Sequence, residues 1–205
     1  MRNVLALLLT LVTFGLTGCG YKTFQATEEE VQVAWSALLN QYQRRSDLVP
    51  ELVTAVTGAA APEQGTLVAV INALAGVTRI KATADLINNP WAFARFVEAQ
   101  ARLTSDLSRL REIVDQYPDL KADLGQRALL AQLEETESRV ATARDRYIVA
   151  VQPYNAAVRT FPTNLTANLL HYSVKPTFSV GQERAIVVLP EVRPEGTYER
   201  PGVAR

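Results

Sequence analysis

The stretch TEEEVQVAWSALLNQYQRRSDLVPELVTAV (Thr27 to Val56) decides the fold, because its seam residues recur at alternating steps of four and three. This 3.5-residue repeat is typical of a helix that packs along one continuous face against other helices. Thr27, with Glu30 three residues later, resembles a capping box and predicts the start of this helix. The seam positions are Val31, Trp35, Leu38, Tyr42, Arg45, Val49, Leu52 and Val56. Because this repeat runs on past Pro50, we expect one continuous, bent helix.

Three further helices are expected downstream. The second spans about Thr66 to Ala84, and the third begins at Pro90, with Asn89 as its N-cap. The fourth begins after an Asp123 cap and ends at Pro162, and the stretch TNLTANLL (Thr163 to Leu170) adds a short helical turn. The third seam comprises Phe93, Phe96, Gln100, Leu103, Leu107, Leu110, Val114 and Tyr117. The fourth comprises Leu130, Leu133, Glu137, Val140, Arg144, Tyr147, Val151, Tyr154, Val158 and Phe161.

Long helical seams joined by short turns predict an all-α protein, an antiparallel four-helix bundle with long helices in up-down-up-down order. We place the bundle at residues 27–178 and expect residues 179–205 to form a largely disordered tail, which is polar and rich in proline and glycine. Within the tail, AIVVL (Ala185 to Leu189) could form an isolated strand or a docking segment. An intermolecular coiled coil is the alternative architecture, but the short proline-bearing connections favour packing within one chain.

The amino terminus reads as a bacterial lipoprotein signal peptide over residues 1–18. Arg2 is followed by an apolar run, Val4 to Leu16, that is too short to span a bilayer as a helix. The run ends in LTGC (Leu16 to Cys19), which resembles a lipobox. We therefore expect lipidation of Cys19, a membrane anchor formed by its acyl chains, and a tether over residues 19–26. Since Gly20 replaces the aspartate of inner-membrane retention signals, a Gram-negative host would place the protein on the periplasmic face of the outer membrane.

The composition argues against several kinds of functional site. The chain has one cysteine and one histidine, too few for a disulfide or a zinc-type cluster. Because the one cysteine is the expected lipid anchor, we also expect no Cys/His nucleophile pair on the mature domain. Its formal net charge is zero, whereas a nucleic-acid-binding protein usually needs a basic face. We expect a protein that is not an enzyme, with no catalytic residues, no metal, no cofactor and no nucleic-acid partner.

Four seam positions are polar, namely Arg45, Gln100, Glu137 and Arg144. In an antiparallel bundle these positions fall near one level at the centre of the helices, so they are predicted to form a structural polar layer that fixes helix register. We expect Arg45 to pair with Glu137 or with another acid of the fourth helix. The alternative is that the buried arginine layer binds a small ligand or an anion.

Four motifs in order resemble the LemA family over Tyr21 to Phe178. They are AWSALLNQYQRRSDLVPELVTAV (Ala34 to Val56), YPDLKA (Tyr117 to Ala122), LEETESRVATARDRY (Leu133 to Tyr147) and YNAAVRTFPTNLTANLL (Tyr154 to Leu170). The chain differs from the family by its lipobox, where many members carry a transmembrane helix, and by Ile148, where the family has asparagine. The resemblance implies an all-helical protein tethered to a membrane at its amino end, without an established enzymatic activity. It predicts a lipid-anchored scaffolding or protein-interaction role in the cell envelope, with an unidentified partner for which a TPM-domain membrane protein is a candidate.

Overall fold

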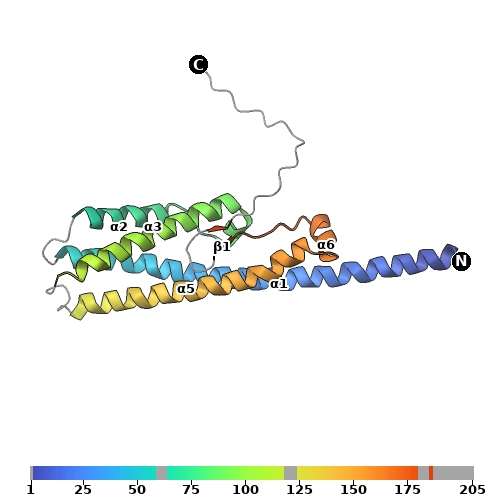
Figure 1. Ribbon diagram of the computed structural model, residues 1–205, viewed down its shortest axis with the longest axis horizontal. Helices are drawn as coiled ribbons and strands as arrows, with labels where there is room; N and C mark the ends of the chain where they lie inside the picture. The colour runs from blue at the N-terminus through green and yellow to red at the C-terminus, as the bar shows by residue number, and fades with distance from the viewer. Residues whose placement is uncertain (1, 59–63, 118–123, 180–184, 187–205) are drawn as a thin grey trace, which may run out of the picture.

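The computed structural model describes residues 2–58, 64–117, 124–179 and 185–186, and it describes side chains for those of them that lie between residues 22 and 179 (Figure 1). The elements in chain order are α1 (Arg2–Gly58), α2 (Gln64–Thr78), the 3₁₀ helix η1 (Ala84–Asn88), α3 (Pro90–Val114), α5 (Leu124–Arg159), α6 (Thr163–Leu169), β1 (Thr177–Phe178) and β2 (Ala185–Ile186). The predicted all-helical fold is confirmed, and the short helix after Pro162 is present as α6.

The long helices pack in two pairs, α1 with α5 and α2 with α3, as Figure 1 shows. These pairs are the part of the expected four-helix bundle that the structure supports, and the complete up-down-up-down order stays a prediction. The short strands β1 and β2 pair antiparallel, with Thr177 opposite Ile186 and Phe178 opposite Ala185. The start of AIVVL is therefore a paired strand rather than an isolated one. The rest of that segment and most of the expected tail lie outside the described residues.

The first helix does not start at the predicted cap. Thr27 lies inside α1, and its hydroxyl donates to the Thr23 carbonyl oxygen at 2.8 Å, as threonines within helices do. Phe24, expected in the tether, is instead buried, with its ring stacked on Tyr172 at a centroid distance of 4.8 Å. This packing stabilises helix upstream of Thr27 by more than the roughly 1 kcal/mol of an N-cap. The helix also continues through Pro50, which confirms its predicted continuity.

The second helix ends at Thr78, six residues before the predicted end at Ala84. Instead of continuing, the chain is held by a long-range contact, in which the Trp35 indole Nε1 donates to the Thr83 carbonyl oxygen at 3.1 Å. A tertiary hydrogen bond thus fixes the segment between α2 and η1, and no local sequence pattern marks it. By contrast, α3 begins as predicted, because the Asn89 side chain accepts from the Ala92 amide at 3.1 Å.

The fourth seam packs as predicted as far as Val158 and fails at its last residue, Phe161. Helix α5 stops at Arg159, before Pro162, and Phe161 is exposed. The proposed Asp123 cap lies outside the described residues. Within the described part of the chain, no helix is both long and apolar enough to cross a membrane.

The apolar core is divided into two clusters along the length of α1. The first is rich in aromatic residues and uses α1 from Phe24 to Tyr42. The second is aliphatic and uses α1 from Val49 to Val56. Arg45 lies between them in the sequence of α1 and is itself fully buried. The division of the core therefore coincides with the predicted polar layer.

Candidate functional site

Three of the four predicted layer residues meet between α1, α3 and α5. The Arg45 Nη1 atom donates to both carboxylate oxygens of Glu137 at 3.0 Å, and it also contacts the Thr104 hydroxyl. Its Nη2 atom donates to the Gln100 side-chain Oε1 and, at 3.2 Å, to the Gln100 carbonyl oxygen. The Tyr42 ring lies against the guanidinium, with Cζ 5.2 Å from the ring centroid. The predicted pairing of Arg45 with Glu137 is therefore present.

The charge of Arg45 is balanced within the protein. Its side chain has no exposed surface, while the Glu137 side chain remains 31% exposed and links the pair to solvent. A buried ion needs such partners, because desolvation costs several kcal/mol per ion. The contacts with two carboxylate oxygens, an amide and a hydroxyl leave little attraction for a further anion at this arginine.

Arg144 does not join this cluster. Within the described part of the chain it forms no hydrogen bond or ion pair, and its Nε atom is buried without a partner. The register explains this, because Arg45 faces Glu137, and Arg144 lies seven residues further along α5. Seven residues correspond to about 10 Å of helix, beyond the reach of the Arg45 contacts.

A second buried cation, Lys175, was not predicted from the sequence. Its Nζ atom donates to Glu28 at 3.0 Å and to Asn88, and it lies 5.2 Å from the centroid of the Tyr154 ring. The Asn155 side chain brackets the Lys175 backbone, accepting from its amide at 2.8 Å and donating to its carbonyl at 2.9 Å. Lys175 falls outside every helical seam, so the periodicity gave no signal for it. The following Pro176, which favours an extended chain before it, was the only local hint.

Two buried tyrosines near this segment have raised pKa values. Burial raises the pKa of the Tyr147 hydroxyl well above its usual value, and this hydroxyl donates to the Pro176 carbonyl at 2.8 Å. Burial also raises the pKa of Tyr154, with smaller contributions from Glu28 and Tyr172. Both phenols therefore stay neutral at physiological pH, which suits hydrogen bonding and packing rather than proton transfer.

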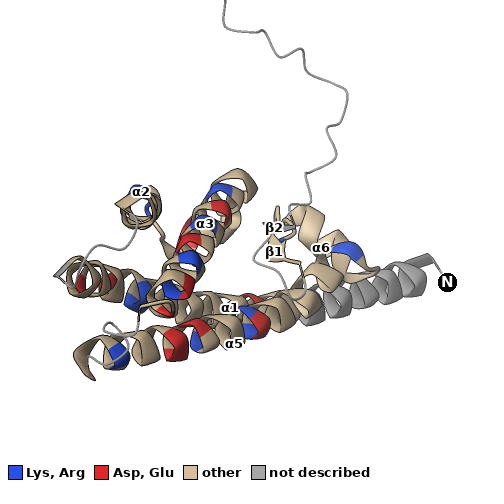
Figure 2. Cartoon of the chain, turned by 60° about the vertical axis from the view of Figure 1, so that its left-hand side comes forward, with Lys and Arg blue, Asp and Glu red and all other residues tan. Residues whose placement is uncertain are grey.

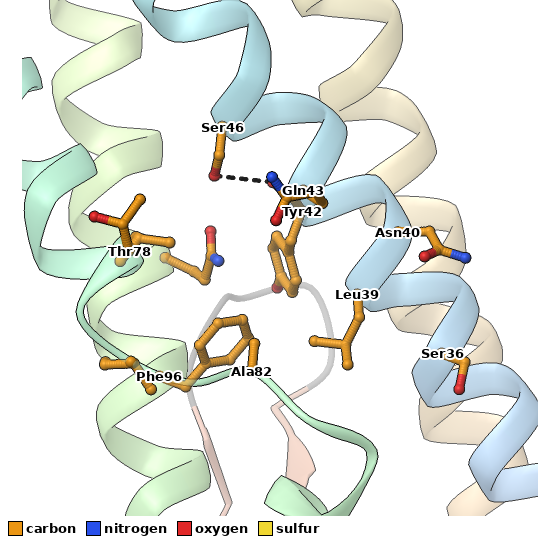
Figure 3. A pocket seen from close by; sticks show the side chains of 12 residues that line it. Ser36, Leu39, Asn40, Tyr42, Gln43, Ser46, Thr78, Ala82 and Phe96 are labelled. Atoms are coloured by element: carbon orange, nitrogen blue, oxygen red, sulfur yellow. Dashed lines mark hydrogen bonds between the residues drawn. The ribbon is translucent and has the colours of Figure 1, made fainter.

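A cleft opens where α2 ends, between α1, the segment after Thr78 and α3 (Figure 3). It has a volume of about 460 Å³. Figure 3 shows Tyr42, Leu39 and Ser46 along its α1 side, with Phe96 and Thr78 facing them. The cleft adjoins the polar layer through Gln100, which belongs to both. None of its described lining residues is charged.

The α1–α5 pair carries two further hollows, which share Glu30 and Arg146 in their walls. Val33 lines one and Val149 the other, and each of these valines is 65% exposed. The register that sets Arg45 opposite Glu137 also sets Val33 level with Val149. Elsewhere, Figure 2 shows acidic and basic residues interleaved along α3 and α5. The valine pair is thus an apolar spot with charged neighbours.

The described residues include no cluster of three or more side chains suited to a metal ion. The serine beside Arg45 is not paired with a base through its hydroxyl hydrogen, because the Ser46 hydroxyl donates to the Tyr42 carbonyl at 3.1 Å. What the arrangement can do chemically is hold helices in register, present apolar hollows and hold a neutral ligand in the cleft.

Comparison with known proteins gives one family. A search of the curated proteins found no match. The model of the LemA family matches residues 34–193, which is most of the chain. The match begins just before Trp35, includes the residues of the polar layer, and extends past the expected bundle end at Phe178 to include β2. On this evidence the chain belongs to the LemA family.

Proposed function

We propose that this LemA-family protein is a lipid-anchored interaction or scaffolding protein of the bacterial cell envelope, without catalytic activity. The observation that carries the proposal is the apolar spot on the α1–α5 pair, where Val33 and Val149 are each 65% exposed beside two hollows. Exposed apolar groups gathered beside hollows are typical of protein interaction sites. Glu30 and Arg146 lie at the same place, and their opposite charges would help to orient a bound partner.

The proposed anchor is the acylated Cys19, following a signal peptide over residues 1–18. Cys19 lies only five residues before Phe24, the first core residue of the described side chains. The backbone of α1 is helical over this interval, so the spacing corresponds to about 8 Å. A lipid at this position would hold the bundle close to the bilayer, and a Gram-negative host would place it on the periplasmic face of the outer membrane.

The proposed partner is another envelope protein, and a TPM-domain membrane protein is the first candidate. A photo-crosslinking amino acid at Val33 or Val149 should capture this partner in living cells. The matched control is the same amino acid at Val68 on α2, which is also exposed but lies away from these hollows. Crosslinks that are equal at all three positions, or absent from all three, would overturn the interaction site.

The anchor is tested separately in the same cells. Metabolic labelling with a palmitate analogue should mark the wild-type chain and leave Cys19→Ser unmarked, and the variant should leave the membrane fraction. A labelled Cys19→Ser protein would exclude lipidation at this position.

For the alternative function, a small-ligand or anion-binding module built from the arginine layer, the geometry gives no support to an anion bound at the arginines. Arg45 is fully buried and already bonded to Glu137, Gln100 and Thr104. Arg144 lies apart from it. An anion would have to displace Glu137 from a buried cation to bind there.

A further inference from the structure

The cleft at the end of α2 is lined by a side-chain hydrogen-bond donor for which the described residues provide no acceptor. Gln100 lines the cleft and is only 1% exposed. Its Oε1 atom accepts from Arg45, and because arginine offers donors only, this contact fixes which end of the amide faces the arginine. The Nε2 atom is thereby turned away from Arg45, and within the described part of the chain it donates to no acceptor. This side-chain N–H group is therefore available to an acceptor brought in from outside.

The other walls of the cleft specify what else the ligand carries. Tyr42 and Phe96 form an edge-to-face aromatic pair there, with ring centroids 5.5 Å apart and planes at 83° (Figure 3). The Ser46 hydroxyl uses its hydrogen on the Tyr42 carbonyl, so its lone pairs are left to accept a donor. The cleft therefore combines an aromatic pair with a side-chain donor and an acceptor, and Ser36, Asn40, Gln43 and Thr78 add further polar groups to its wall.

The charge of the cleft restricts the ligand further. No aspartate, glutamate, lysine, arginine or histidine is among its lining residues in the described chain. An ionised ligand would lose hydration there without gaining a counter-charge, which is unfavourable. Its volume of about 460 Å³ lies within the range of small-molecule sites.

We propose that this cleft binds a small uncharged amide that bears an apolar group, such as a blocked apolar amino acid or the equivalent part of a peptide. Gln100 Nε2 donates to the ligand carbonyl, Ser46 Oγ accepts from the ligand N–H, and the apolar group packs against Tyr42 and Phe96. Arg45 acts as a positioning residue, because it orients the Gln100 amide without touching the ligand. This site is separate from the valine pair on the α1–α5 face and does not depend on the proposed scaffolding role.

The test is a titration of the isotope-labelled full chain, solubilised in detergent, with N-acetyl-phenylalaninamide, followed by NMR. The side-chain NH₂ signals of Gln100 and the backbone amides around Ser46 and Phe96 should shift saturably. The charged analogue N-acetyl-phenylalanine, which differs by its carboxylate, should bind about 10-fold or more weakly. Absence of saturable shifts at millimolar ligand, or equal binding of both compounds, would overturn the proposal.

Two variants locate the site. Gln100→Glu keeps an acceptor for Arg45 but removes the donor, and it should weaken binding of the neutral amide about 10-fold. Ala82→Phe places a ring into the cleft from an exposed position and should abolish binding, whereas Ala84→Phe, at an exposed position that does not line the cleft, should leave it unchanged. Circular dichroism and thermal unfolding establish that each variant is folded. Binding that survives both Gln100→Glu and Ala82→Phe would show that the amide binds elsewhere.

Discussion

The contact between Arg45 and Glu137 is the single interaction on which the centre of the protein most depends. Replacing Glu137 with alanine leaves a fully buried guanidinium that keeps its contacts with Gln100 and Thr104 but loses this carboxylate. We expect the free energy of unfolding to fall by about 3 kcal/mol. This value is at the lower end of the usual cost of breaking a buried ion pair, because Glu137 is partly exposed. Urea denaturation followed by circular dichroism measures this loss.

The matched control is Glu134→Ala, one turn earlier on the same helix. Glu134 pairs with Arg111 at 2.9 Å, but both side chains are largely exposed, so its loss should cost less than about 1 kcal/mol. If the two alanine variants unfold at the same urea concentration, the buried pair has no special importance for stability.

For single residues, the sequence predicted most members of the polar layer but not all of the contacts that they make. The seam placed Arg45, Gln100 and Glu137 together because their positions follow from the heptad repeat. It could not exclude Arg144, since the register between two antiparallel helices depends on which turns face each other. Thr104 was missed because it lies off the seam, four residues after Gln100, where its hydroxyl donates to the Gln100 carbonyl at 3.1 Å.

Among the elements, boundaries set by local chemistry were predictable and those set by tertiary contacts were not. The start of α3 follows from Asn89 and Pro90 alone. By contrast, α1 continues upstream of Thr27 where Phe24 packs on Tyr172, and the chain after α2 is bonded to Trp35. The extended segment that carries Lys175 was missed for the same reason, because its partners are distant in the sequence.

This segment is held to α5 partly by Tyr147, which gives the protein a specific alkaline sensitivity. The folded state keeps the phenol neutral, since burial raises its pKa, whereas the unfolded chain ionises above about pH 10. The contribution of Tyr147 to the free energy of unfolding is therefore complete below pH 10. It falls as the pH rises further, by up to about 1.4 kcal/mol per pH unit. At pH 7, Tyr147→Phe should lower the free energy of unfolding by about 1 kcal/mol, because the Pro176 carbonyl loses its donor. Above pH 10, the free energy of unfolding of this variant should fall less steeply with pH than that of the wild type.

Denaturant unfolding of both proteins between pH 7 and pH 11.5 checks this expectation. Tyr117→Phe serves as the control, because it removes a tyrosine hydroxyl from an exposed position. Parallel curves for wild type and Tyr147→Phe above pH 10 would mean that this phenol ionises equally in both states.

For the whole molecule, the sequence predicted an all-helical chain with a polar centre, but not a core divided in two. The aromatic cluster lies on one side of Arg45 along α1 and the aliphatic cluster on the other. The repeat alone cannot show this division, because aromatic and aliphatic residues satisfy the same seam. The division gives the polar layer a role in register, since moving α1 by one heptad along α5 would take Arg45 away from Glu137 and set it level with Leu130 or with Arg144.

This role predicts that an apolar layer would keep the protein stable while making it less uniquely arranged. In the triple variant Arg45→Met, Gln100→Leu and Glu137→Leu, no buried polar partner is stranded, so the free energy of unfolding should stay equal or rise by about 1–4 kcal/mol. Spin labels on cysteines introduced at the exposed positions Val33 and Val149, with Cys19 replaced by serine, report the α1–α5 register through pulsed electron paramagnetic resonance. The unmodified layer should give one narrow distance distribution and the triple variant a broader or split one. An equally narrow distribution in both would show that the aromatic cluster alone sets the register, with no contribution from the arginine layer.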